Sequence, residues 1–212
     1  SEIKLFKQGN LGVPTYKEYI ILKLAENSKI GIDAKILLSS DINEILSKKK
    51  YKIVDFDLLG EVWNGRKALP NGKIFILEDK YTGKSYKEKV KEIRKVLKEK
   101  GADYNIISSL DDIAWIYNFR GCDIIHNPVA LSFTIISEKK STLYINEKKL
   151  DKKAQKYFKD NKIEVKEYFE FFKDIKKLKG SILVDFNKIS YAIYEAISKN
   201  ALINSMNPST YL

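Results

Sequence analysis

The sequence is poor in the residues that form disulfides, metal centres and guanidinium contacts with phosphate. Its 212 residues include one cysteine, Cys122, and one histidine, His126. A single cysteine excludes an internal disulfide framework and fits a reducing compartment, so we expect a cytoplasmic protein. Only three arginines are present, which is few for a protein that grips phosphates through bidentate pairs.

Long apolar runs are also missing. No stretch approaches the roughly 18 apolar residues that a membrane span requires, and the opening SEIKLFKQGN lacks a signal-peptide layout. We therefore expect no membrane partner. Hydrophobic residues make up 44% of the chain and aromatic residues 12%, which is typical of a globular protein with one large domain or two small ones.

Acidic residues are outnumbered, and the formal net charge is +11 with a pI near 9.4. Such an excess can attract nucleic acid or anionic membrane. However, the lysines are spread along the chain and alternate with acids, as in KEKVKEIRKVLKEK. This alternation is typical of a solvated helix face, so we predict no nucleic-acid partner.

The order of expected helices and strands near the start recurs near the end. A shift of 152 positions places Ile30 on Ile182 and Asp33 on Asp185. The recurrence predicts an α/β fold with two related domains in tandem. The first block is expected as a helix at 15–26, a strand at 29–33, a helix capped by Ser40 and a strand at 51–56. The second is expected as a helix at 169–178, a strand at 181–185, a helix at 190–198 and a strand at 201–206.

A turn-rich link at 63–73, WNGRKALPNGK, separates the two parts. We place the C-terminal part of a first domain at 1–78 and a complete second domain at 79–212. Two strands do not make a stable sheet, so we expect that residues preceding Ser1 are missing. Further elements expected in the second domain are a helix at 84–100, a strand at 104–108, a helix begun by a Ser109–Asp112 capping box, a hairpin of 132–137 with 142–146, a helix at 151–159 and a strand at 163–165.

The most informative stretch is 108–137, SSLDDIAWIYNFRGCDIIHNPVALSFTIIS. Its leucine–aspartate pair, IAW helix, N-x-R-G-x-D turn and HNPV segment resemble a segment of eukaryotic-type aminopeptidase P. The sequence departs from that pattern at Asp112, Phe119 and Cys122, where the family usually has glutamate, leucine and serine. The matching residues are Leu110, Asp111, Ile113, Ala114, Trp115, Asn118, Arg120, Gly121, Asp123, His126, Asn127, Pro128 and Val129.

Further marks of the same family are scattered in order over most of the chain. Asp79 with 81–83 looks like its DYTG segment, and 190–192 after Asp185 looks like its SYA segment. Val62 and Trp63 stand where its first domain ends with a similar pair. The resemblance therefore covers nearly the whole sequence.

The resemblance implies an Xaa-Pro aminopeptidase of three domains, two creatinase-like α/β domains followed by a catalytic pita-bread domain. The two creatinase-like domains are expected to have mixed sheets flanked by helices, the first partial and the second complete in this sequence. Such enzymes remove an N-terminal residue that precedes proline, using two manganese ions held by two Asp, one His and two Glu. His126 lies in the middle-domain turn, and the chain stops about where the pita-bread domain would begin. We therefore expect an inactive fragment without catalytic or metal-binding residues. Its expected partners are proline-containing peptides and its own catalytic domain, with a homodimer when full-length.

Four polar residues cluster in the turn-rich loop of the family motif: Arg120, Asp123, His126 and Asn127. One interpretation is that this loop faces the catalytic domain and frames the substrate entrance, restricting access to short peptides. The other is structural. In that case Asp123 or Asn127 caps a turn, Arg120 pairs with Asp123, and His126 makes a buried hydrogen bond.

Two other functions stay open. The chain could be a stand-alone binding module on the same fold with an anionic partner. It could also be a small thiol enzyme that uses Cys122, with His126 four residues further on. The aromatic residues Trp115, Tyr117 and Phe119 could stack on bases, but their place after a helix start favours a core role. Asp33 and Asp185, at strand ends, are expected to cap turns.

Overall fold

The computed structural model describes residues 3–212, apart from the side chain of Leu58. Ser1, on which the expectation about a missing start falls, lies outside the described residues. The chain forms two compact units, one of Ser1–Arg66 with Ser190–Ala192 and one of Lys67–Ile189 with Ile193–Leu212. No helix within 3–212 is both long enough and apolar enough to cross a membrane.

Unit 1 ends at Arg66, and the segment after the link bonds to unit 2. The amide of Ile74 donates to the carbonyl of Lys149 at 3.0 Å, and that of Leu77 to the carbonyl of Asn118 at 2.8 Å. A two-residue strand, β3 (Phe75–Ile76), pairs with β5 (Phe119–Arg120). This strand was missed in the sequence because two residues carry no alternation pattern.

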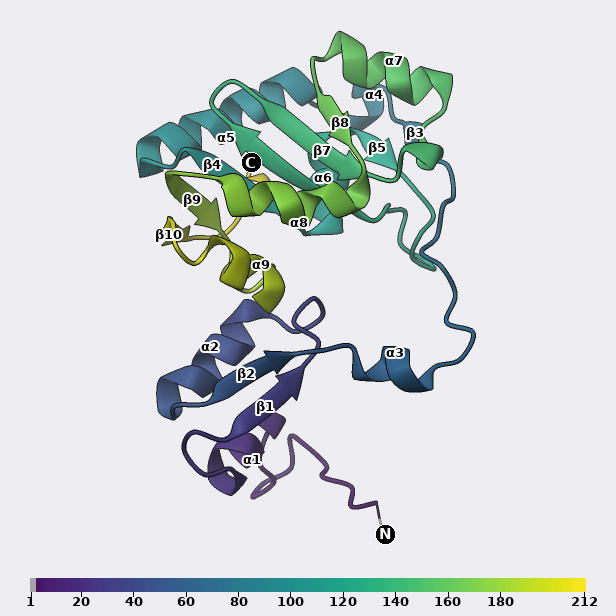
Figure 1. The fold of residues 1–212 in the computed structure, drawn as a ribbon. Helices are drawn as coiled ribbons and strands as arrows, with labels where there is room; N and C mark the ends of the chain where they lie inside the picture. The colour runs from purple at the N-terminus through teal and green to yellow at the C-terminus, as the bar shows by residue number, and fades with distance from the viewer. Residues whose placement is uncertain (1–2) are drawn as a thin grey trace. The chain divides into compact units, whose positions relative to one another are not determined.

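Unit 1 contains a parallel pair of short strands (Figure 1). Thr15 and Glu18 form a capping box at the first helix, which is shorter than predicted because Leu24 is already extended. Leu38, not Ser40, is the N-cap of the second helix, and no side chain caps it, so that prediction was wrong. The elements are α1 (Tyr16–Lys23), β1 (Lys29–Ile32), α2 (Ser39–Lys48), β2 (Lys52–Asp55) and α3 (Leu58–Val62).

Unit 2 is built on a six-stranded mixed sheet of order β10-β9-β4-β6-β7-β8, with helices packed on it (Figure 1). The mixed α/β fold predicted from the sequence is therefore confirmed. The strands are β4 (Tyr104–Ile107), β6 (Ser132–Ser137), β7 (Ser141–Ile145), β8 (Glu164–Lys166), β9 (Ser181–Val184) and β10 (Ala201–Asn204). The helices are α4 (Asp79–Thr82), α5 (Tyr86–Lys100), α6 (Leu110–Ile116), α7 (Lys152–Asp160), α8 (Phe171–Asp174) and α9 (Tyr191–Ile197).

Alternate side chains of the central strands enter two separate cores. Ile107 and Ile136 pack in a cluster with Ile93 of α5. Their neighbours Ile106 and Ile135 belong to the second cluster, which holds side chains from α8 and α9. Because successive residues of a strand point to opposite faces, a sheet with helices on both faces needs apolar residues at consecutive positions.

Helix starts in unit 2 differ in whether a side chain caps them. Ser85 accepts from the amide of Glu88, whose carboxylate bonds back, and Gly101 in the left-handed conformation ends α5. Ser109 is the N-cap of α6, but its side chain makes no capping hydrogen bond, so the predicted capping box is wrong. The helix predicted at 169–178 is broken into α8 between two 3-10 turns, Tyr168–Glu170 and Ile175–Lys177.

The two strand-end aspartates make the same turn. Asp33 Oδ1 accepts from the amide of Lys35 at 3.0 Å, and Asp185 Oδ1 accepts from the amide of Asn187 at 3.0 Å. Each is an Asx turn directly after a strand, as the sequence predicted for these acids.

The repeat continues to the next strand of each block. The amide of Ala34 donates to Asp55 Oδ1 at 2.8 Å, and the amide of Phe186 donates to Asn204 Oδ1 at 3.1 Å. In both blocks the two strands run parallel. The recurrence seen in the sequence is therefore a repeated strand–helix–strand arrangement with the same polar contacts.

Candidate functional site

The candidate loop runs from β5 to β6 and folds back on itself. The amide of Gly121 donates to the carbonyl of Pro128 at 3.1 Å, and that of Asp123 to the carbonyl of Val129 at 3.1 Å. A Cβ on Gly121 would lie 2.8 Å from the Cβ of Ala130, so this close approach requires glycine. At the tip, His126 adopts φ +64°.

Asp123 is the fixed point of this loop. Its Oδ1 lies 2.6 Å from Nζ of Lys149, and both side chains are withdrawn from solvent. Its Oδ2 accepts from the amide of Leu131 at 2.7 Å, and Lys149 also donates to the carbonyl of Pro70 at 2.6 Å. The expected pairing of Arg120 with Asp123 is therefore wrong, because Lys149 occupies that carboxylate.

Arg120 instead bonds to main-chain oxygens. Its Nη1 donates to the carbonyl of Ala114 at 3.0 Å and to that of Phe119 at 2.8 Å. Beside it, Lys89 donates to the carbonyl of Trp115 at 2.8 Å and lies 4.4 Å from the centre of the Trp115 ring. Two cations thus bind the carbonyl end of α6, where the helix dipole favours positive charge.

Lys89 is fully buried on the core side of α5. Burial lowers its pKa to about 8, and the nearby charge of Arg120 acts in the same direction. Its Nζ also donates to Oδ1 of Asn118, whose φ is +52°. Lys89 therefore holds the strained turn that leads into the candidate loop.

The tip of the loop faces solvent. Ile124 is 43% exposed and Ile125 83% exposed. His126 is exposed as well, so the expectation that it makes a buried hydrogen bond is wrong. Asn127 Nδ2 donates to Oδ1 of Asp111 at 3.4 Å, a long bond near the surface.

The four predicted residues thus separate into two groups. Arg120 and Asp123 are fixed by hydrogen bonds and ion pairing, whereas His126 lies at the exposed tip and Asn127 beside it is half-buried. Cys122 is exposed, and within 3–212 no hydrogen bond joins it to His126. The geometry gives no support to a thiol–imidazole pair.

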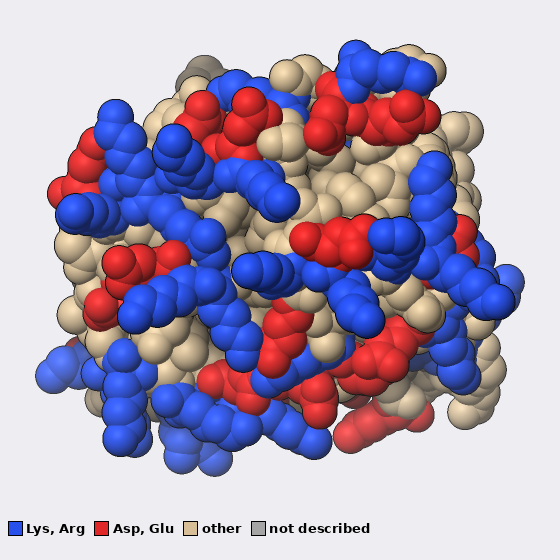
Figure 2. All heavy atoms as spheres, turned by 90° about the horizontal axis from the view of Figure 1, so that it is seen from above, with Lys and Arg blue, Asp and Glu red and all other residues tan. Residues whose placement is uncertain are grey.

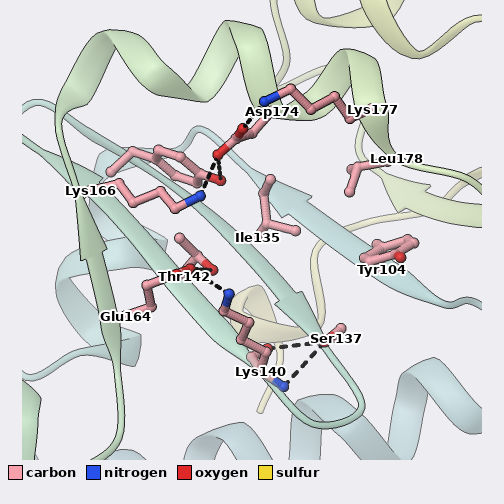
Figure 3. A pocket seen from close by; sticks show the side chains of 11 residues that line it. Tyr104, Ile135, Ser137, Lys140, Thr142, Glu164, Lys166, Asp174, Lys177 and Leu178 are labelled. Carbon is pink, nitrogen blue, oxygen red and sulfur yellow. Dashed lines mark hydrogen bonds and ion pairs between the residues drawn. The ribbon is translucent and has the colours of Figure 1, made fainter.

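A separate pocket of about 250 Å³ lies between the sheet and the α8 segment (Figure 3). Asp174, at the end of α8, lines this pocket and accepts three hydrogen bonds. Its Oδ2 accepts from Nζ of Lys166 at 2.7 Å and from the hydroxyl of Tyr144 at 3.1 Å, and its Oδ1 accepts from Nζ of Lys177 at 2.9 Å. Hydrogen bonds from Lys166 above all, and from Lys177 and Tyr144, lower the pKa of Asp174 to about 2.

The second carboxylate of the pocket is also occupied. Glu164 Oε2 accepts from Thr142 Oγ1 at 2.8 Å and lies 2.8 Å from Nζ of Lys140. Burial on its own raises the pKa of Glu164, but the bonds from Lys140 and Thr142 outweigh it and leave the pKa lowered. For Tyr144, burial and the charge of Asp174 raise the pKa. The two carboxylates thus stay ionised and the phenol stays protonated, so these groups are poor general acids or bases near neutral pH.

Within 3–212, no group of three or more His, Cys, Asp or Glu side chains is arranged to hold a metal ion. The residues described therefore do not fit a dinuclear metal site.

Two buried lysines that shape the candidate loop were missed in the sequence. Lys149 stands in the run EKK, which is typical of a solvated surface. No signal in the sequence distinguishes it from Lys148. Lys89 did carry a signal, because it stands three residues after Tyr86 and four before Ile93, on the apolar side of α5.

Residues 65–212 match the family model described as the Creatinase/Prolidase N-terminal domain. That match covers well over half of the sequence. The chain belongs to the Creatinase/Prolidase N-terminal domain family. The resemblance seen in the sequence is thereby confirmed.

Relatives of this family member are named as Xaa-Pro aminopeptidases. It is 34% identical over 224 residues to Xaa-Pro aminopeptidase 1 of Dictyostelium discoideum, covering 98% of this chain and 35% of the relative. It is 36% identical over 191 residues to a probable Xaa-Pro aminopeptidase P of Coprinopsis cinerea, covering 87% of this chain and 30% of the relative. The chain thus spans about a third of the length of these relatives.

A solved structure of an aminopeptidase has a similar fold. The X-prolyl aminopeptidase of Caenorhabditis elegans, described as a cytosolic enzyme with a dinuclear active site, matches with a TM-score of 0.86 and 25% identity. The match covers 96% of this chain and 35% of that one. The creatinase N-terminal-like fold of this chain is therefore shared with a known member of the aminopeptidase group.

Proposed function

We propose that this chain is the non-catalytic front part of a metal-dependent Xaa-Pro aminopeptidase, which removes the N-terminal residue preceding proline from peptides. The observation that carries this proposal is the coverage of the Dictyostelium discoideum relative, where 98% of this chain matches only 35% of the relative. The two expected domains, 1–78 as part of a first creatinase-like domain and 79–212 as the middle one, belong to the proposal.

The proposal also includes the metal ions and the assembly state of the whole protein. The dinuclear active site of the Caenorhabditis elegans enzyme supports two metal ions in the whole protein. We propose that these are manganese, held by a catalytic domain that the 212 residues do not contain. A homodimer formed through that domain and a cytoplasmic location belong to the same proposal, the latter supported by the cytosolic relative.

For the front part we propose a geometric role, in which the 120–127 loop frames the substrate entrance. Three features support it. Asp123 and Lys149 fix the base of the loop, Gly121 lets it double back, and its tip presents exposed isoleucines rather than charges. A rigid loop with an apolar tip can limit access by folded or long chains without taking part in chemistry.

The activity is tested with the isolated chain and a chimera. In the chimera, this chain replaces the matching segment of the Dictyostelium discoideum enzyme. With manganese, the chimera is expected to release arginine from Arg-Pro-Pro, whereas the isolated chain releases none. Cleavage by the isolated chain, or a folded chimera that binds manganese and has no activity, contradicts the proposal.

The entrance role is tested in the same chimera with Ile125→Ser. We expect KM for a nonapeptide that begins Arg-Pro-Pro to rise about fivefold, because one exposed apolar contact with the longer peptide is removed. The tripeptide should be cleaved as before. The control is Ile36→Ser, at a 62% exposed isoleucine in unit 1. Equal kinetics for both peptides in both variants would exclude a role of the loop tip in substrate access.

A further inference from the structure

The positive charge of the protein is concentrated in one part of the chain. Residues 67–212 contain 28 Lys and Arg against 19 Asp and Glu, whereas residues 1–66 contain 11 against 9. In the view from above, Lys and Arg side chains spread over the face with acidic side chains between them (Figure 2). Lysines that these acids do not neutralise, rather than the net charge, would mark a site for an anion.

A groove of about 1000 Å³ in unit 2 collects such lysines. We call it the basic groove. Its lining includes Lys91, Lys95 and Lys98 from α5, Lys139 from the β6–β7 turn and Lys179 from the segment before β9. All five side chains are exposed.

The lysines of α5 lie in a row for a physical reason. Val90, Ile93 and Leu97 are buried, which fixes the rotation of the helix on the sheet. Positions 91, 95 and 98 then follow one another at i, i+4 and i+7 along one flank. With a rise of 1.5 Å per residue, the first two ammonium groups project about 6 Å apart along the helix axis.

Few acidic groups compensate this row. Among the described residues, Lys91, Lys98, Lys139 and Lys179 form no ion pair, and Lys95 has one exposed pair with Glu99 at 3.8 Å. Exposed pairs of this kind contribute little. The groove is therefore lined by free positive charge.

Two other charged side chains of the groove, Asp103 and Arg94, already have protein partners. Asp103 Oδ2 accepts from the amide of Ser181 at 2.7 Å and from its hydroxyl at 2.9 Å. Arg94 turns inward and donates to the carbonyl of Ser137 at 2.9 Å. Glu138 is the remaining acid on the described lining. An incoming anion thus meets lysines rather than the arginine.

The basic groove continues into the pocket of Figure 3. Tyr104 and Ser137 line both cavities. On the pocket side, Ile135 and Leu178 provide apolar surface, and Lys177 remains 72% exposed beyond its bond to Asp174. An elongated anionic ligand that lies along α5 would therefore reach a pocket large enough for one side chain.

We propose that the basic groove binds an acidic peptide segment in an extended conformation. In a strand, side chains on one face repeat about every 6.7 Å, which approximates the spacing between Lys91 and Lys95. A nucleic acid fits the groove less well. Half-buried Tyr104 is the one aromatic ring on the described lining, so a platform for base stacking is missing. The one arginine, Arg94, already bonds to the protein, so bidentate phosphate contacts lack their usual group. The concave shape also disfavours a flat membrane surface. This proposal does not depend on the aminopeptidase assignment.

The test uses the 212-residue chain and a fluorescein-labelled dodecapeptide of alternating Glu and Gly, with fluorescence anisotropy at about 50 mM salt, where screening is weak. The Lys91→Gln/Lys95→Gln/Lys98→Gln variant is expected to bind about tenfold more weakly. The matched control removes the same charge from α7, which does not line the groove, as Lys152→Gln/Lys153→Gln/Lys159→Gln. It is expected to lose less than about twofold.

A second variant, Lys139→Glu/Lys179→Glu, reverses the charge of the two groove lysines outside α5 and is expected to weaken binding at least as much. If circular dichroism shows that the α5 variant does not fold, this second variant decides the test. An equal loss in the α7 control would show general charge attraction and overturn the proposal. Tighter binding of a dodecathymidylate than of the acidic peptide, or no loss in either groove variant, would overturn it as well.

Discussion

The ammonium group of Lys149 lies 2.6 Å from the carboxylate Oδ1 of Asp123, and both side chains are almost completely withdrawn from solvent. The pair joins three segments that are distant in sequence, because Lys149 also binds the carbonyl of Pro70. Removal of one partner leaves the other charge buried without compensation, which is far more costly than the loss of an exposed pair.

The first prediction concerns this pair. Asp123→Asn is expected to lower the free energy of unfolding of unit 2 by about 3–5 kcal/mol, because the Lys149 charge stays buried. Urea denaturation followed by tryptophan fluorescence measures it. Lys148→Met, at the exposed neighbouring residue, is the control and should change stability by less than about 0.5 kcal/mol.

The double variant Asp123→Leu/Lys149→Met separates charge from packing. Replacing both partners by apolar side chains should recover most of the loss, because no buried charge remains. If the double variant is as unstable as Asp123→Asn, the effect does not come from the uncompensated lysine.

The second prediction compares two serines at helix starts. Ser85→Ala should destabilise the protein by about 1 kcal/mol, because the Ser85 side chain caps the amide of Glu88. Ser109→Ala should cost only a few tenths of a kcal/mol, because the Ser109 side chain makes no capping bond. Thermal unfolding of the two variants under the same conditions gives the comparison. Equal losses would mean that the side chain of Ser109 caps α6 after all.

The third prediction concerns the stability of the fold at acidic pH. The folded pKa of Asp174 is lowered to about 2, below the value near 3.9 expected in the unfolded chain. Its ionised form therefore stabilises the fold above about pH 4, and this stabilisation is lost as the pH falls toward 2. Asp174→Asn should cost about 1 kcal/mol at about pH 6 after allowance for solvent screening, and much less at about pH 2.5. Asp160→Asn, at an exposed carboxylate, serves as the control in the same denaturation series.

The fourth prediction concerns mildly alkaline pH. The folded pKa of Lys89 is lowered to about 8, whereas the unfolded value is near 10.4. Between these values the unfolded chain binds more protons than the folded one, so stability should rise as the pH increases from about 7.5 to about 9.5. In Lys89→Met this rise should disappear, whereas the exposed Lys87→Met should keep it. A pH-independent wild-type stability over this range would exclude a depressed pKa.

The fold was predictable where one local pattern dominates. The helix α5 has an apolar spacing, a capping box and a terminal glycine that all agree, and its observed start and end lie within two residues of the prediction. The repeat was also predictable, because Asp33 and Asp185 follow strands with matched apolar residues. Short elements such as β3 were not, since their partners lie far away in sequence.

The candidate loop shows what sequence reasoning leaves open. The motif placed Arg120 and Asp123 close together in the chain. In the structure Arg120 ends β5 and Asp123 lies in the loop that follows, and the partners of both depend on tertiary packing. Lys149, from another segment, pairs with the carboxylate of Asp123. The guanidinium group of Arg120 donates to main-chain carbonyls, including that of Ala114 in the preceding helix. Residue type predicts that buried charges need partners, and only the fold decides which ones.

The parallel pair in unit 1 has a practical consequence for the isolated chain. In the described residues, β1 and β2 pair only with each other, so each strand has an outer edge whose main-chain groups lack a strand partner. Such edges can add a strand from another molecule. Self-association that grows with concentration in the 212-residue chain would therefore report on these strand edges.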